Sequence, residues 1–139
     1  GMEQVSYPSR LDGIGTGNLF AGINSDLGAQ LAGGLGLAPS GNIHPGKTSL
    51  FEPIHGSAPN IAGKGIANPL GAVLASAMML EFLGWEQEAA ALNSAVKAAV
   101  HANFLTVDLS GNHSTTEVGN WLAKSAVDSA QMSTRRQLK

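Results

Sequence analysis

The segment HGSAPNIAGKGIANP, residues 55–69, constrains the fold more than any other part of the sequence. It contains three glycines and two prolines and leads into the most apolar run of the chain. Glycine loses backbone entropy in regular structure and proline lacks an N–H donor, so this segment cannot lie inside a helix or a strand. Hydrogen-bonding side chains are dense along it, at His55, Ser57, Asn60, Lys64 and Asn68. A long loop of this kind is usually functional or disordered, and it is the first candidate for a binding site.

The composition sets limits on the class of protein. A chain of 139 residues suits one domain, which we expect over residues 1–132, followed by a flexible tail over residues 133–139. The formal net charge is -2, and the only basic cluster lies in that tail, so nucleic acid is not an expected partner. The absence of cysteine excludes disulfides, thiolate chemistry and sulfur-ligated zinc.

The most apolar run, IANPLGAVLASAMMLEFLGW over residues 66–85, is about long enough to cross a bilayer. It contains Asn68, Pro69 and Glu81, however, which favours a buried helix and no membrane contact. Residues 1–10 show no cationic patch followed by an apolar segment. We therefore predict no signal peptide and a cytoplasmic protein.

The first half of the chain offers weak signals for regular structure. Residues 10–20 alternate as a strand would, but Gly13, Gly15 and Gly17 make it a weak strand at best. A short helix is expected from Asn24, with Asn24 or Ser25 as its cap and leucines at 27, 31 and 35 on one face, and GGLG at residues 33–36 favours its end. A turn at residues 45–46 then leads into a short strand through Leu50 and Phe51.

The second half predicts three helices. Asn68 and Pro69 suit the start of a central helix that is apolar nearly all round and ends at Gly84. An amphipathic helix follows over residues 86–104, with one face formed by Ala89, Leu92, Val96, Ala99 and Val100. STTE at residues 114–117 is a capping box for a last helix, which presents Val118, Trp121, Leu122 and Ser125 on one face.

Local motifs by themselves do not define a function. The spaced glycines of residues 13–17 lack the final glycine and the preceding strand of a dinucleotide fingerprint. The four histidines have no metal-ligand spacing, and no G-x-S-x-G motif is present. Asp26, in the first turn of an expected helix, suits the helix dipole.

Four longer blocks carry a more specific signal. NLFAGINSDLGAQLAGGLGLAPSGNI, LFEPIHGSAPNIAGKGIANP, ASAMMLEFLG and TVDLSGNHSTTEV together resemble the isocitrate/isopropylmalate dehydrogenase family, over roughly residues 10–123. Members of that family are NAD(P)-dependent, metal-dependent oxidative decarboxylases of 2-hydroxy acids such as isocitrate, 3-isopropylmalate and tartrate. The resemblance is to the C-terminal portion only. It implies an α/β, isopropylmalate-dehydrogenase-like fold represented by its helix-rich part, about four helices on a small sheet.

The resemblance also implies a role for the loop, whose family counterpart wraps the adenosine half of the nicotinamide cofactor. By this analogy His55 lies against the adenine, Asn68 hydrogen-bonds the adenine edge, and Glu52 approaches the nicotinamide end. The remaining implied cofactor residues are Gly56, Ser57, Ala58, Asn60 and Ile61. The alternative is that the loop is a structural remnant.

Two departures from the family pattern concern the cofactor and the metal. NAD-using members have an acid at the position of Asn60, because a carboxylate accepts both ribose hydroxyls and repels a 2′-phosphate. With Asn60 the choice between NAD and NADP stays open. Of the two aspartates in the family's Mg²⁺ or Mn²⁺ motif, Gly22 replaces the first and Asp26 matches the second. A hard cation needs several oxygen ligands, so Asp26 is a poor metal site by itself.

The resemblance implies a cofactor-binding fragment that is inactive alone, because the family's substrate arginines, catalytic tyrosine and lysine and a further metal aspartate lie upstream of the matching part. The isolated chain is therefore not assigned an activity. Two alternatives remain, a non-catalytic interaction protein derived from the family and one chain of a split enzyme whose other chain carries the N-terminal half. By analogy with the family, we expect a homodimer.

Overall fold

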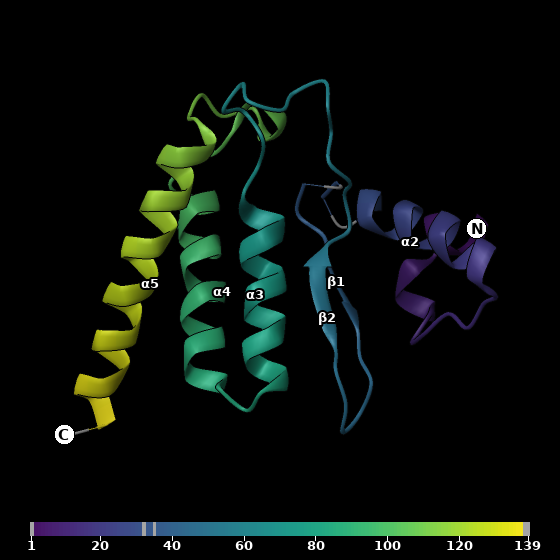
Figure 1. The fold of residues 1–139 in the computed structure, drawn as a ribbon, viewed down its shortest axis with the longest axis horizontal. Helices are drawn as coiled ribbons and strands as arrows, with labels where there is room; N and C mark the ends of the chain where they lie inside the picture. The colour runs from purple at the N-terminus through teal and green to yellow at the C-terminus, as the bar shows by residue number, and fades with distance from the viewer. Residues whose placement is uncertain (1, 32, 35, 138–139) are drawn as a thin grey trace.

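The structure, a computed structural model, describes residues 2–31, 33–34 and 36–137. Figure 1 shows helices α3, α4 and α5 side by side, a β-hairpin on the outer side of α3, and the N-terminal helices beyond the hairpin. Within the described residues there are five α-helices, of which α1 spans five residues, and one sheet of two strands. The predicted fold class, a helix-rich α/β portion with a small sheet, is confirmed.

The N-terminal part consists of α1 (Met2–Ser6), the 3-10 helix η1 (Pro8–Arg10) and α2 (Asn18–Leu31). The weak strand considered for residues 10–20 is absent there, since α2 begins at Asn18 and the Ala21 N–H donates to the Gly17 carbonyl at 2.9 Å. The helix therefore starts six residues before the predicted cap at Asn24. The Ser25 hydroxyl instead donates to the carbonyl of Gly22 inside the helix.

The end of α2 agrees better with the sequence. Gly33 and Gly34 have φ values of 120° and 104°, and the Gly34 N–H donates to the Ala29 carbonyl at 2.9 Å. Positive φ is easily adopted only by glycine, so this pair closes the helix as predicted. Leu35, the last residue of the predicted leucine face, lies outside the described residues.

The sheet is an antiparallel hairpin of β1 (Pro39–Asn42) and β2 (Leu50–Pro53), with Ser40 opposite Glu52. The predicted turn is confirmed, because the Lys47 N–H donates to the His44 carbonyl at 3.1 Å and Gly46 has φ of 75°. The strand through Leu50 is also confirmed. Strand β1 was not predicted, since proline, glycine and asparagine are poor strand formers.

Helix α3 (Leu70–Phe82) lies between the hairpin and α4 (Glu86–His101), so the prediction of a central, largely apolar helix is confirmed. Its start is fixed by the Asn68 side chain, whose Oδ1 accepts the Leu70 N–H at 2.9 Å. Its end is fixed by Gly84, with φ of 83°. The Trp85 N–H donates back to the Leu80 carbonyl, which completes the turn into α4.

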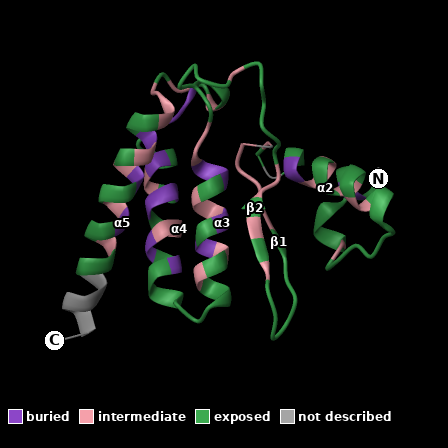
Figure 2. Cartoon of the chain, viewed as in Figure 1, coloured by how far each residue is buried: buried purple, intermediate pink, exposed green. Residues whose placement is uncertain are grey.

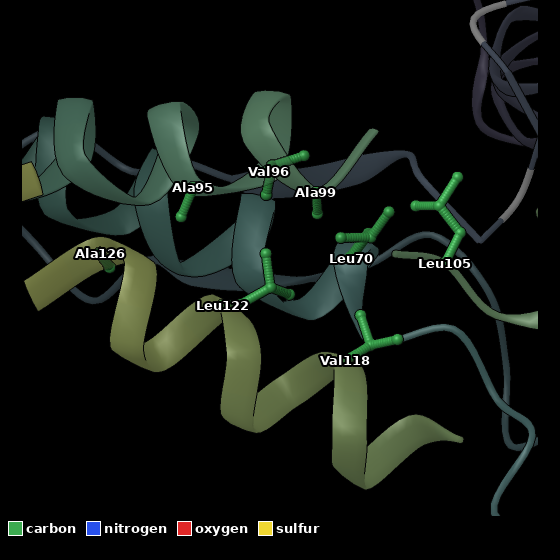
Figure 3. Close-up of a cluster of buried hydrophobic side chains, with 8 residues drawn as sticks. All are labelled: Leu70, Ala95, Val96, Ala99, Leu105, Val118, Leu122 and Ala126. Carbon is green, nitrogen blue, oxygen red and sulfur yellow. The ribbon is translucent and has the colours of Figure 1, made fainter. Parts of the chain in front are cut away.

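The hydrophobic core lies where α3, α4 and the first half of α5 (Thr115–Gln137) meet (Figures 2 and 3). Leu70, Val118 and Leu122 are the largest aliphatic side chains among its fully buried residues and are at most 1% exposed. Alanines dominate the contribution of α4, and such small residues let neighbouring helices approach closely. The predicted buried face of α4 is correct at Ala89, Val96 and Ala99. It is wrong at Val100, which is 47% exposed. Ala91 and Ala95 are buried instead.

Helix α5 begins at the predicted capping box. The carboxylate of Glu117 accepts the Ser114 N–H at 2.8 Å and the Ser114 hydroxyl at 2.7 Å, and the Glu117 N–H donates back to that hydroxyl at 3.3 Å. The backbone of α5 is helical through Gln137, which includes most of the predicted tail. The flexibility of that tail stays a prediction, and residues 138–139 lie outside the described part.

The Ser114 N–H, its hydroxyl and the nearby His113 lower the pKa of Glu117 from its ordinary value of 4.5. The charged carboxylate therefore stabilises the folded state at pH values above the ordinary pKa of a glutamate. This stabilisation is lost as the pH falls through the lower pKa that Glu117 has in the folded state. Glutamine also completes a capping box but does not titrate here. We expect the thermal midpoint of Glu117→Gln to fall less than that of the unmodified chain between about pH 6 and about pH 3.

The control is Glu81→Gln, the same chemical change at an exposed position in the last turn of α3. Its midpoint should follow that of the unmodified chain. Parallel midpoint curves for Glu117→Gln and the unmodified chain would refute a stabilising role for the charged cap.

In the part of the chain that the structure describes, no helix is long and apolar enough to cross a membrane. The most apolar run of the sequence forms α3, which has 13 residues. Two of its residues, Leu70 and Ala77, are almost completely buried against other parts of the chain. This agrees with the prediction of a buried helix.

Candidate functional site

A pocket of about 660 Å³ lies beside the loop of residues 55–69. The loop runs from β2 to α3 across the end of the molecule where α5 begins (Figure 1). The other walls come from Gly36, from Asp108 in the 3-10 helix η2 (Val107–Leu109), and from Thr115 and Thr116 in the first turn of α5. Four segments of the sequence thus line one pocket.

The loop is shaped by turns and tied to α5. The Ile61 N–H donates to Ala58 O at 3.0 Å and the Lys64 N–H donates to Ile61 O at 3.1 Å, so two turns follow each other. Gly63 and Gly65 have φ values of 76° and 67°, which explains the glycines at these positions. Thr115 then donates twice to the loop, from its N–H to Gly65 O at 2.8 Å and from its hydroxyl to Ala67 O at 2.6 Å.

The structure brings together most of the predicted cofactor residues. Six of the eight line the pocket, namely His55, Gly56, Ser57, Ala58, Ile61 and Asn68. Asn60 is exposed and lies in sequence between two lining residues but is not part of the wall, and Glu52 projects from β2 outside the pocket. The structure therefore brings six of the eight predicted residues to one pocket, and their role in cofactor binding stays a prediction.

In the pocket wall the side chain of Asn68 is hydrogen-bonded at both ends of its amide. Its Oδ1 accepts the Leu70 N–H at 2.9 Å, and its Nδ2 donates to Oδ2 of Asp108 at 2.9 Å. The other oxygen of Asp108 accepts the Thr106 hydroxyl at 2.5 Å. Sequence reasoning missed Asp108 as a site residue although it lies in the block TVDLSGNHSTTEV, because only the fold brings it to Asn68, 40 residues away in sequence.

The chemical character of the pocket is that of a binding site. Its wall is mainly apolar, with Ile61, Ile66 and several alanines, and its polar groups include the hydrogen-bonded pair Asn68 and Asp108 and two threonines. His55 is exposed, and its Nδ1 lies 3.0 Å from the carbonyl oxygen of Gly56, its own neighbour. Small-molecule sites combine apolar walls with a few placed polar groups in this way.

The candidate metal residue does not belong to this pocket. Asp26 is an exposed residue of α2, and Gly22 occupies the position one turn before it. Among the residues that the structure describes, no group of three His, Cys, Asp or Glu side chains could hold a metal ion. Since a divalent cation needs several oxygen ligands, the described residues alone do not fit a Mg²⁺ or Mn²⁺ site.

Comparison with known proteins shows which family this chain is similar to. Isocitrate/homoisocitrate dehydrogenase of Thermus thermophilus is 53% identical over 114 residues, which are 82% of this chain and 34% of that protein. The 3-isopropylmalate dehydrogenase of Archaeoglobus fulgidus is 48% identical over 88% of this chain and 37% of its own length. The chain thus spans about a third of the length of these relatives.

The fold agrees with this comparison. The crystal structure of isocitrate dehydrogenase from Methylococcus capsulatus matches with a TM-score of 0.85 and 41% identity, covering 90% of this chain and 38% of that one. The sequence profile described as "Isocitrate/isopropylmalate dehydrogenase" matches residues 1–122. The family predicted from the four sequence blocks is confirmed: the chain belongs to the isocitrate/isopropylmalate dehydrogenase family.

Proposed function

We propose that this chain is a C-terminal, cofactor-binding fragment of an NAD(P)-dependent oxidative decarboxylating dehydrogenase of 2-hydroxy acids. Its pocket binds the adenosine part of the cofactor. The observation that carries this proposal is that His55, Ser57, Ile61 and Asn68 line one pocket of about 660 Å³. Ile61 and Ile66 offer apolar surface to the faces of a purine, and Asn68 offers an amide to its edge.

The fragment is inactive alone in this proposal. Oxidative decarboxylation needs a base for the hydroxyl proton, an acceptor for the hydride and a metal that polarises the new carbonyl. Asp108 and His55 line the pocket proposed for the adenosine part, which takes no part in this chemistry. The described residues also supply no complete metal site. Substrate binding and chemistry therefore require the portion of the family fold that this chain does not span.

We propose further that the chain forms a homodimer through α2. Leu19, Phe20 and Ile23 of this helix are 75%, 63% and 60% exposed, and large exposed apolar groups of this kind mark interaction surfaces. A twofold dimer is the commonest closed assembly. A second chain carrying the missing upstream portion is the alternative occupant. Light scattering at micromolar concentration decides between them, because a clean monomer without the second chain contradicts the homodimer.

A non-catalytic interaction protein is the second candidate function. Gly13, Gly15 and Gly22 support it, because they lie where the family pattern has side chains. A Cβ at each would meet no atom within 4 Å, so nothing in the described structure requires glycine there for lack of space. The two functions differ in ligand binding, because the interaction protein needs no intact adenosine pocket.

Titration with AMP, NAD and NADP, followed by amide chemical shifts, tests the favoured function. We expect each to perturb resonances of residues 55–68, with weak affinity because contacts to the nicotinamide half are missing. Mapping of the shifts to α2 or to the hairpin would argue for a different site. No perturbation at millimolar ligand would refute adenosine binding and leave the interaction protein as the function.

Asn60 is expected to control the choice between NAD and NADP. Replacing it by aspartate adds a carboxylate that accepts hydrogen bonds from the ribose hydroxyls and repels a 2′-phosphate. Because the position is exposed, we expect the lower end of the usual range for such bonds, about tenfold tighter NAD binding, together with weaker NADP binding.

The matched control for this substitution is Asn42→Asp. It adds the same charge to an exposed residue of β1 outside the pocket. The affinities of both cofactors should stay within about twofold of the unmodified chain in the control. Equal behaviour of the two variants would show that residue 60 does not face the ribose.

A further inference from the structure

We propose that Asp12 is a site of spontaneous isoaspartate formation, and that the resulting structural change is confined to the N-terminal part of the chain. The modified residue lies in the connection between η1 and α2, away from the adenosine pocket. Asp12 and Gly13 form the only Asp-Gly pair in the sequence, and no asparagine in the sequence is followed by glycine. The structure around this pair carries the proposal.

The reaction needs only groups of this chain and water. The backbone nitrogen of Gly13 attacks Cγ of Asp12, so that a C–N bond forms, a C–O bond of the carboxyl group breaks and one water leaves. Water then opens the resulting succinimide ring. Hydrolysis at the main-chain carbonyl of Asp12 leaves a chain that runs through Cβ and Cγ, which is isoaspartate, and hydrolysis at Cγ restores aspartate. No atom is oxidised or reduced.

The structure leaves both reacting groups free. Residues 11–17 form no helix or strand, and Asp12 and Gly13 are both exposed. No described residue accepts a hydrogen bond from the Gly13 N–H, and none pairs with the Asp12 carboxylate. A Cβ at Gly13 would meet no atom within 4 Å, so the space beside the attacking nitrogen is open. Glycine also leaves the backbone free to bring that nitrogen close to Cγ.

The other three aspartates are held in ways that oppose this attack. Asp26 lies within α2 and Asp128 within α5, where the N–H of the next residue belongs to the hydrogen-bond pattern of the helix. The carboxylate of Asp108 accepts the Thr106 hydroxyl. The N–H that follows Asp108 belongs to Leu109 and donates to the Thr106 carbonyl at 3.1 Å. Asp12 therefore differs from the other aspartates in its structure as well as in its neighbour.

The product alters the connection between two short parts of the fold. Isoaspartate adds one methylene group to the main chain between η1 and α2. Asp12 and Gly13 line a pocket of about 390 Å³ together with Gln4 and Gly28. The Gln4 amide donates to the Asn24 carbonyl at 2.8 Å, which links α1 to α2. Because the hydrophobic core contains no residue of α1 or α2, we expect the core to keep its packing.

The test ages the folded chain at neutral pH and compares Gly13→Ala with Gly15→Ala. The tryptic peptide of residues 11–47 contains both Asp12 and Asp26. Electron-transfer fragmentation, which cleaves the Cα–Cβ bond that isoaspartate places in the main chain, assigns the modification to one of them. We expect isoaspartate at residue 12 of the unmodified chain and none at residue 26.

The two alanine variants identify the attacking nitrogen. The yield of isoaspartate should fall several-fold in Gly13→Ala, because the methyl group restricts the backbone and shields the nitrogen. It should stay unchanged in Gly15→Ala, which adds the same group to the same segment but not next to an aspartate, and where a Cβ also meets no atom within 4 Å. Equal yields in the two variants would overturn attack by the Gly13 nitrogen.

A synthetic peptide of residues 8–17 gives the rate without a fold. The folded chain should form isoaspartate at residue 12 at a comparable rate, and a much lower rate would overturn the proposal because the fold would then protect the pair. If Gly13→Ala does not fold, Asp12→Glu decides, since the ring that glutamate would form is larger and closes more slowly. Total isoaspartate, measured by enzymatic methylation of the intact chain, should then fall to background, and an unchanged total would refute the assignment to residue 12.

Amide spectra of the aged chain test the second part of the proposal. Resonances of residues 2–31 should shift as isoaspartate accumulates, because these residues form α1, η1, α2 and their connections. Those of Leu70, Val118 and Leu122 should stay in place, because these residues belong to the core of α3, α4 and α5. Shifts of the core resonances would contradict a change confined to the N-terminal part.

Discussion

Replacing Gly111 by alanine is expected to lower the free energy of unfolding by about 3 kcal/mol, the upper end of the usual range for overpacked sites. A Cβ at this position would lie 1.9 Å from the carbonyl oxygen of Leu105 and 2.3 Å from its carbonyl carbon. These are backbone atoms, so no side-chain rotation relieves the clash. The connection between α4 and α5 would have to open.

Opening that connection disturbs several interactions at once. The Leu105 carbonyl accepts the His113 N–H at 3.1 Å, and the Thr106 carbonyl accepts the N–H groups of Leu109 and Gly111. Leu105 itself is a core residue, 6% exposed. The substitution therefore costs backbone hydrogen bonds as well as packing, which supports an effect at the upper end of the range.

Gly119→Ala is the matched control. Gly119 lies inside α5, and a Cβ there would meet no atom within 4 Å. Alanine has the higher helix propensity, so we expect this variant to gain about 0.5–1 kcal/mol. Urea unfolding followed by circular dichroism measures both, and a Gly111→Ala variant within about 0.5 kcal/mol of the unmodified chain would contradict the steric argument.

The second large effect concerns catalysis. We expect the isolated chain to produce no reduced cofactor with NAD or NADP, Mg²⁺ or Mn²⁺, and isocitrate, homoisocitrate or 3-isopropylmalate. The reason is chemical, because the described pocket contacts only the proposed adenosine part and the described residues offer no group of three metal-ligating side chains. Absorbance at the wavelength of the reduced nicotinamide measures this directly.

A full-length member of the family assayed in parallel provides the positive control. Addition of a polypeptide that carries the upstream portion of such a relative tests the split-enzyme alternative in the same cuvette. Activity that appears only after this addition would favour a two-chain enzyme. Steady turnover by the isolated chain would contradict the proposal that the fragment is inactive.

The sequence predicted the starts and ends of helices best where a single short segment contains all the residues that determine them. Asn68 with Pro69, and Ser114 with Glu117, start their helices through bonds between residues at most three apart, and both starts were correct. Gly84 likewise ends α3 through its own backbone conformation. Such local signals do not depend on the rest of the fold, so they can be interpreted before the structure is known.

The predictions of secondary structure were wrong where contacts between distant parts of the chain determine the local conformation. Strand β1 is composed of poor strand formers and exists because it pairs with β2 and packs on α3. Helix α2 begins at Asn18 in spite of nearby glycines. Val100 has the right spacing for the core, but the rotation of α4 is set by alanines that fit against α3 and α5.

The residues of the candidate site fall into the same two groups, those predicted from one segment and those brought together only by the fold. The loop residues were predicted because glycine, proline and polar residues alternate within one segment, and because that segment carries the family resemblance. Gly36, Asp108 and Thr115 were missed as site residues. Each reaches the pocket from a different part of the chain, and only the packed structure brings them to Asn68 and the loop.

The two bonds from Thr115 to the loop also determine the order in which this chain can become competent to bind. Residues 65 and 67 are synthesised well before residue 115, so the two contacts that Thr115 makes with their carbonyls can form only once that residue has been added. During synthesis the loop is therefore present for about fifty residues without its anchor. Because Thr115 and Thr116 of α5 form part of the pocket wall, a ligand that binds there would report that the last helix is in place.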